Sequence, residues 1–166
     1  MSGPLPTLEQ VQALPCAHEQ AIPPEFADAN GHMNIVRYMQ LHNDAAWKYM
    51  DHFGLGEDHA ADGSAGSFEV EQHLRYVREV HVDDVVAVHI RMLGRSDKAL
   101  HVMQFLINKT RNELANTFES MSLSVDMATR KVVPYPPHVA DLLDARLRID
   151  RALNWAVPLA SAMAPR

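Results

Sequence analysis

A change of hydrophobic period after residue 53 constrains the fold of this chain more than any other feature. Between residues 35 and 53, apolar side chains recur every three or four positions, which predicts one amphipathic helix. From residue 68 onward the period is two, and turn residues divide this segment into four expected strands, at 68–82, 85–93, 100–109 and 114–127. A helix with one apolar face has to cover that face with the sheet.

The expected fold class is therefore α+β, with a curved antiparallel sheet wrapped around one long central helix. The four strands follow one another through short polar turns, which predicts an antiparallel meander. Before the helix, residues 17–27 suit a further strand, which Pro23 and Pro24 limit to an edge or a broken strand. A short helix is expected from about 138 to 149.

The length of 166 residues predicts one domain, which we place at residues 17–150. Residues 1–16 are expected to form an irregular lead-in, and residues 151–166 a weakly amphipathic, peripheral tail. Residues 54–67 are rich in glycine and predict a flexible loop, long enough to act as a lid or a binding loop.

Composition narrows the classes of function. The net charge of −6 argues against a nucleic-acid partner, and no apolar run approaches the length of a membrane span. The single cysteine, Cys16, leaves no intrachain disulfide, and the first ten residues do not resemble a secretory signal. Ten histidines are present without a paired metal-ligand spacing. We therefore expect a cytoplasmic protein with no metal and no membrane partner.

The candidate functional site is the segment Asp28-Ala29-Asn30-Gly31-His32-Met33-Asn34, directly before the helix. Either Asn30 or Asn34 suits the helix cap, and Gly31 suits a tight turn into the helix. Free N–H groups and the helix dipole favour negative charge there, so such a place can hold an oxyanion that develops during acyl transfer. The same residues also suit ordinary capping with an exposed His32, and the segment alone leaves both interpretations open.

This segment and the order of elements resemble the hotdog fold, in the 4-hydroxybenzoyl-CoA thioesterase-like branch of acyl-CoA thioesterases. The chain matches the motif of that branch, an Asp three residues before a Gly followed by His, Asn and Tyr, at Asp28, Gly31, His32, Asn34 and Tyr38. The sequence Asn-Gly-His-Met-Asn at residues 30–34 is also similar to the corresponding segment of thioesterases linked to carnitine and betaine catabolism.

Acyl-carrier-protein thioesterases are similar too. Their Asp-x-Asn-x-His-x-Asn pattern is present, and their Tyr-x-Arg-Glu strand motif corresponds to Tyr76, Arg78 and Glu79. Two positions depart from these patterns. Ile35 stands where a second Asn is usual, and Val80 stands where that group often has Cys, which excludes a thiol role there.

The resemblance implies hydrolysis of an acyl-CoA thioester, with no cofactor besides the CoA ester itself. Asp28 is then a general base on water or a nucleophile, Asn30 orients the water or Asp28, and His32 assists the carbonyl or the leaving thiolate. The implied substrate-binding residues are Gly31, Met33, Asn34, Tyr38, Glu71 and Glu79. Cations expected to bind the CoA phosphates are Arg91, Arg95 and Lys98. Glu71 and Glu79 equally suit a solvated sheet face.

Two other functions fit the same fold, namely a hydratase or dehydratase of acyl thioesters, and a non-catalytic acyl-thioester binding module. Some hotdog hydratases use Asp-x-Asn-Pro followed by a residue and His, whereas Gly31 replaces that Pro here and His32 comes one position early. The resemblance also implies a homodimer or a dimer of dimers, because a hotdog monomer leaves a sheet edge exposed. The acyl group, and the choice between CoA and acyl carrier protein, stay open.

Overall fold

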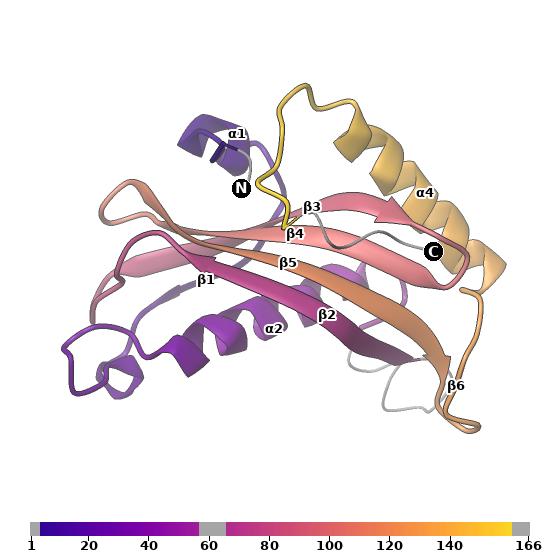
Figure 1. Ribbon diagram of the computed structural model, residues 1–166, viewed down its shortest axis with the longest axis horizontal. Coiled ribbons are helices and arrows are strands. Elements are labelled where there is room, and N and C mark those ends of the chain that lie inside the picture. Colours follow the sequence, from indigo (N-terminus) through magenta and orange to yellow (C-terminus); the bar gives the residue numbers. More distant parts are fainter. Residues whose placement is uncertain (1–3, 57–65, 161–166) are drawn as a thin grey trace.

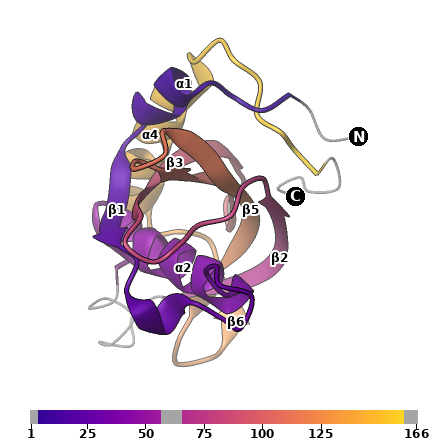
Figure 2. The ribbon, with the colours of Figure 1, turned by 90° about the vertical axis from the view of Figure 1, so that its left-hand side faces the viewer.

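An antiparallel sheet curls around a long helix in the computed structural model, which describes residues 4–56 and 66–160 (Figures 1 and 2). The strand order is β1-β3-β4-β5-β2, and a short β6 pairs with β5. The strands are β1 (Cys16–Ala21), β2 (Gly66–Tyr76), β3 (Val85–Arg95), β4 (Ala99–Asn108), β5 (Glu113–Asp126) and β6 (Lys131–Val132). The helices are α1 (Leu8–Gln12), the 3-10 turn η1 (Pro24–Phe26), α2 (Ile35–Asp51) and α4 (Pro137–Arg151). This is the hotdog arrangement, so the expected fold class is confirmed.

Helix α2 lies in the hollow of the sheet, where Figure 2 views it along its axis. Tyr38, Leu41, Ala45 and Tyr49 form its buried face, at the expected helical spacing. They pack against alternate residues of the inner sheet face, including Val86, Val88, Ile90, Leu100 and Leu106. The apolar period of residues 35–53 therefore identified the buried face of the helix correctly, except at Ile35, which is 62% exposed.

The expected four-strand meander is only partly correct. Strands β3, β4 and β5 do form a meander, but β2 pairs with β5 at the far edge of the sheet. Residues 77–84 make this possible because they cross the beginning of α2 instead of turning back beside β3. Val80, which is fully buried, accepts a hydrogen bond from the N–H of Met33 at 2.7 Å. A periodic strand pattern does not state which neighbour the strand pairs with.

Strand β2 contains a bulge that reverses the faces of its side chains. Glu69 stands opposite Ser122, but Glu71 stands opposite Met121, so Val70 is an additional residue. Beyond the bulge, Leu74 faces Phe118 on the inner side. Glu69 therefore shares the inner face with Leu74, whereas Glu71 lies on the outer face. Uninterrupted alternation along residues 68–82 would place Glu69 and Glu71 on the same face, and the bulge separates them.

A second, smaller core covers the outer face of the sheet. Residues 8–12 form α1, with a capping box at Thr7, so the expectation of an irregular segment is wrong there. Val11 packs with Leu153, Trp155 and outer-face residues of β3, β4 and β5. The ring of Trp155 lies 5.8 Å from that of Phe105. The segment around residue 155 is therefore part of this core and not a peripheral tail.

The remaining elements largely follow the sequence. Strand β1 is an edge strand, as expected, and it ends at Ala21, before the two prolines at the start of η1. Helix α4 matches the expected helix and runs beside β3 beyond the part that pairs with β1. Its fully buried Asp150 accepts the backbone N–H of Met92 at 2.8 Å. The expected lid or binding loop falls mostly on residues 57–65, outside the described residues.

Candidate functional site

The segment from Asp28 to Asn34 forms a tight turn that leads into α2. Ala27 and Met33 face each other as an antiparallel bridge, and the N–H of Gly31 donates to the carbonyl of Asp28 at 3.0 Å. Gly31 has a φ of +82°, a conformation that favours glycine. The turn is also held from the side, because the Nδ1 of His81 lies 3.2 Å from the carbonyl oxygen of Gly31.

Asn34, and not Asn30, caps the helix. Its side-chain oxygen accepts the N–H of Val36 at 2.9 Å. Asp28 instead accepts the N–H of Asn30 at 2.8 Å, within the turn. Its Oδ1 lies 3.9 Å from the Nδ1 of His32, and both side chains remain partly exposed. A carboxylate and an imidazole thus stand side by side just before the first turn of α2.

A cavity of about 290 Å³ opens beside this turn, between the start of α2 and the segment after β2. We call it the turn cavity. Four of the predicted site residues line it together with other side chains; its lining residues are His32, Met33, Ile35, Tyr38, Tyr76, Val77, Arg78 and Glu79. The rings of Tyr38 and Tyr76 meet edge to face at 5.1 Å. Burial raises the pKa of Tyr38 to about 12, so its phenol stays protonated at neutral pH.

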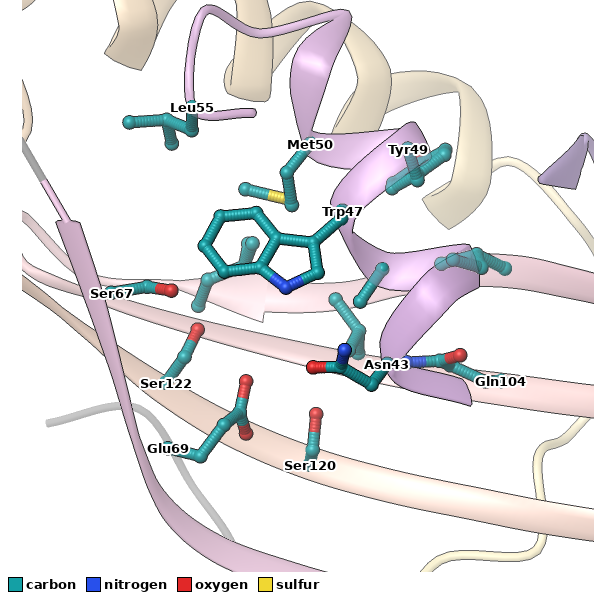
Figure 3. A pocket seen from close by; sticks show the side chains of 14 residues that line it. Asn43, Trp47, Tyr49, Met50, Leu55, Ser67, Glu69, Gln104, Ser120 and Ser122 are labelled. Atoms are coloured by element: carbon teal, nitrogen blue, oxygen red, sulfur yellow. The ribbon is translucent and has the colours of Figure 1, made fainter. Parts of the chain in front are cut away.

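A second cavity of about 210 Å³ lies further along α2, between that helix and the sheet (Figure 3). We call it the sheet cavity. One wall is apolar, with Met50, Leu55, Ile90, Leu100 and Val102. The other lining residues are Asn43, Ala46, Trp47, Tyr49, Ser67, Glu69, Gln104, Ser120 and Ser122. None of these was predicted as a site residue. For Glu69 the reason is the β2 bulge, which turns it inward and leaves no signal in the hydrophobic period.

Glu69 differs from the two predicted glutamates. As part of an edge strand the residue is exposed overall, but its carboxylate points into the sheet cavity (Figure 3). Burial there raises the pKa of Glu69, and hydrogen bonds with Ser120 and Gln72 act in the opposite direction. Glu71 is exposed on the outer face, and Glu79 lines the turn cavity, where its carboxylate lies 3.6 Å from the Nε2 of His81.

The three predicted CoA-binding cations are not brought together. A bulge at Leu93 sets Arg91 opposite Met103 on the outer face and Arg95 opposite Leu100 on the inner face. The Arg91 guanidinium donates to the carbonyls of Asp150, Leu153 and Trp155. Arg95 binds both carboxylate oxygens of Asp144. Lys98 is exposed at the β3–β4 turn, where it lines a third cavity with Ser96, Asp97, Val132 and Pro134.

The described residues contain neither a metal-binding cluster nor a helix that could span a membrane. Within residues 4–56 and 66–160, no group of three or more His, Cys, Asp or Glu side chains is arranged to hold a metal ion. The helices in the same part of the chain are too short or too polar to cross a membrane.

Residues 22–143, which span the turn, both cavities and most of the sheet, match the sequence profile of the thioesterase-like superfamily. The chain belongs to this superfamily. Among curated relatives, L-carnitine dehydrogenase/betainyl-CoA thioesterase from Agrobacterium fabrum is 35% identical over 76% of this chain. The chain spans about a quarter of that relative, 26% of its length. Betainyl-CoA thioesterase from Pseudomonas aeruginosa is 27% identical, with 82% of this chain and 86% of the relative covered.

Solved structures of other proteins have the same fold as this chain. A Staphylococcus aureus protein crystallised in complex with CoA superimposes with a TM-score of 0.80 at 23% identity, over 92% of this chain and 97% of that one. A thioesterase-like protein from Pseudomonas putida gives a TM-score of 0.75 at 22% identity, over 92% and 96% of the two chains. At these identities the likeness concerns the fold alone.

Proposed function

We propose that the protein hydrolyses an acyl-CoA thioester to a free acid and CoA. The observation that supports this most is the turn that sets Asp28 beside His32 at the edge of the turn cavity, in a chain of the thioesterase-like superfamily. Thioester hydrolysis needs an oxygen nucleophile, donors for the carbonyl oxygen and an exit for the thiolate. The residues around this cavity offer each of the three.

In the proposed reaction, Asp28 delivers the oxygen nucleophile, either by removing a proton from water or by attacking the carbonyl carbon itself. The N–H groups of Gly31 and Met33 are already taken by backbone carbonyls, so the N–H of His32 is the proposed oxyanion donor. When the C–S bond breaks, the CoA thiolate leaves with the electron pair, and a proton from the attacking water reaches it through the His32 imidazole beside Asp28. Where Asp28 attacks the carbonyl carbon itself, a water then hydrolyses the resulting anhydride, which releases the free acid and restores the carboxylate. Asn30 holds the Asp28 carboxylate through its own N–H.

We further propose that the protein is at least a homodimer, joined along the edge of β2 that pairs with no other strand among residues 4–56 and 66–160. This edge strand exposes large apolar side chains, with Phe68 63%, Val70 47% and Tyr76 49% exposed. Ile35 and Val36 on the first turn of α2 are 62% and 66% exposed. Pairing two antiparallel β2 strands would cover both groups and satisfy the unpaired backbone of each edge.

Lys98 is the proposed contact for a CoA phosphate, because it is the exposed cation of the three predicted ones. The relatives' names make betainyl-CoA the first ester to offer this protein. We propose that the substrate is a small-molecule acyl-CoA ester and that hydrolysis needs no cofactor.

The proposed function is tested by thiol release from a panel of acyl-CoA esters, with Asp28→Asn beside the wild type. Asparagine keeps the side-chain oxygen that accepts the N–H of Asn30, so the turn is retained while the base is lost. We expect turnover to fall by about a hundredfold or more. Glu9→Gln makes the same change of charge at an exposed position of α1, beyond the outer face of the sheet, and should leave turnover unchanged.

Other outcomes would separate the alternatives. Loss of the conjugated absorbance of a 2-enoyl-CoA without thiol release would identify a hydratase. Tight binding of esters with neither reaction would identify a binding module. Full activity in Asp28→Asn would refute the role of that carboxylate.

A further inference from the structure

We propose that the sheet cavity binds a positively charged acyl end, of the quaternary ammonium type, between the indole of Trp47 and the carboxylate of Glu69. The inference rests on the proposed function, since it assigns the acyl part of the ester to this cavity. It adds two specificity-determining residues that lie outside the Asp28 turn and its cavity.

Trp47 provides the aromatic side of the cavity. It lies on the same face of α2 as Asn43 and Met50, four residues before it and three after, and its ring projects into the cavity (Figure 3). The face of an indole ring carries negative electrostatic potential and attracts cations more strongly than other aromatic rings. Apolar side chains of the sheet, Ile90 and Leu100 among them, continue this wall and suit the methyl groups of a quaternary ammonium.

Glu69 provides the charge. Its carboxylate reaches into the cavity from β2, on the side away from Trp47 (Figure 3). Among the described residues that line the cavity there is no Lys, Arg or His, so the cavity itself holds no counter-ion for this carboxylate. Residue 69 is exposed overall, so its carboxylate is only partly withdrawn from water, and its polar partners are the neutral Ser120 and Gln72. A cationic ligand in the cavity would supply the opposite charge that these partners lack. The rise in the pKa of Glu69 caused by burial agrees with this environment.

The bulge at Val70 in β2 turns the Glu69 side chain inward. Without the additional residue Val70, Glu69 would lie on the outer face with Glu71. Bulges of this kind often re-aim a side chain near a functional site. The carboxylate also repels anions, which makes the cavity unsuitable for the CoA phosphates and leaves the acyl end as its occupant.

The size of the cavity favours a compact group. Its volume of about 210 Å³ corresponds to roughly seven water molecules at about 30 Å³ each. Serine hydroxyls at Ser67, Ser120 and Ser122 line the side near Glu69, so this side is polar while the Trp47 side is largely apolar. A small cation covered with methyl groups meets both requirements.

The test uses two esters of the same shape that differ by one charge, trimethylammonioacetyl-CoA and 3,3-dimethylbutanoyl-CoA. The measured quantity is the ratio of kcat/KM for the cationic ester to that for the neutral ester. In the wild type we expect this ratio to exceed one by about tenfold or more. Glu69→Gln, which keeps the shape, should reduce the ratio about tenfold, chiefly through KM of the cationic ester. Trp47→Leu should reduce it as well, whereas Trp47→Phe should retain part of it.

Glu9→Gln serves as the control for overall charge and should keep the wild-type ratio. The same comparison is made by calorimetry with ketone analogues, in which a methylene group separates the carbonyl carbon from the CoA sulfur and prevents hydrolysis. A binding preference for the cationic analogue that Glu69→Gln abolishes would support the inference even if neither ester were hydrolysed, and the proposed function would then fail by itself. Hydrolysis of both esters with a ratio that neither Glu69→Gln nor Trp47→Leu alters would overturn the inference and leave the thioesterase proposal intact.

Discussion

The buried imidazole of His42 should make the fold sensitive to mild acid. His42 is fully buried on the inner side of α2, with its Nδ1 3.1 Å from the Oε1 of Gln104 and its Nε2 2.5 Å from the Oδ1 of Asn116. Asn116 donates its amide to the carbonyl of Arg75, which fixes its oxygen toward His42. Burial lowers the pKa of His42 to about 4, and the hydrogen bonds to the two amides oppose this only in part.

The sign of the effect follows from proton binding. The pKa of a histidine in the unfolded chain is about 6.5. Between about pH 4 and pH 6.5 the unfolded chain therefore binds a proton at His42 that the folded chain does not bind. Stability is therefore fully present above about pH 6.5 and is lost as the pH falls toward 4. The difference between the two pKa values corresponds to about 3 kcal/mol, at about 1.4 kcal/mol per pKa unit. That is a large part of the stability of a typical domain, about 5–15 kcal/mol.

Urea unfolding at about pH 7.5 and about pH 5 measures how much free energy of unfolding is lost between the two pH values, in the wild type and in His42→Gln. Other groups titrate in both proteins, so the difference between their losses isolates His42. At about pH 5 the wild type should lose about 2 kcal/mol more than the variant. His52→Gln, at the exposed C-cap of α2, is the matched control and should lose as much as the wild type. Equal losses in the wild type and His42→Gln, or a His42 resonance that titrates near pH 6.5 in the folded protein, would refute the reasoning.

Two further predictions concern packing and assembly. Arg91→Ala should lower the free energy of unfolding by about 3 kcal/mol, because three carbonyls lose their donor and the ring of Trp155 loses the guanidinium stacked 4.2 Å above it. Urea unfolding followed by circular dichroism measures this loss, with Arg148→Ala at an exposed position as the control. Phe68→Lys should halve the mass seen in sedimentation and reduce thiol release, because a lysine blocks pairing of the β2 edge, whereas Val132→Lys on β6, 44% exposed, should keep both. An unchanged mass in Phe68→Lys would place the interface elsewhere.

The parts that the sequence predicts well are those set by local chemistry. The period of residues 35–53 defines α2 and its buried face, Asn34 is among the two expected caps, and Gly31 adopts the positive φ that a tight turn requires. The strands β3, β4 and β5 likewise follow from alternation and turn residues. These features depend on neighbours a few positions apart, and a short stretch of sequence contains all the relevant contacts.

The parts that the sequence does not predict depend on contacts distant along the chain. A single additional residue at Val70 is invisible to a count of alternating residues, yet it exchanges the faces of Glu69 and Glu71. The bulge at Leu93 does the same for Arg91 and Arg95. In both cases the register is set by the partner strand, β5 for β2 and β4 for β3. In each pair the sequence shows that the side chains are charged, but it does not show which face of the sheet each one occupies.

The two bulges bear on how one ester could use both cavities. The turn cavity lies at the end of β2 and the sheet cavity at its beginning, and residues of β2 or of the segment just after it line each of them. Two β2 strands that pair antiparallel bring the end of one beside the beginning of the other. In the proposed dimer, Asp28 of one protomer would therefore stand near the Glu69 side of its partner. A thioester placed at the turn could then extend its acyl end across the interface toward Trp47 and Glu69.

Under this arrangement, an inactive Asp28→Asn protomer and a Glu69→Gln protomer, mixed in one dimer, form one site with both residues intact. Such heterodimers should recover preference for the cationic ester, whereas neither homodimer would combine activity with that preference.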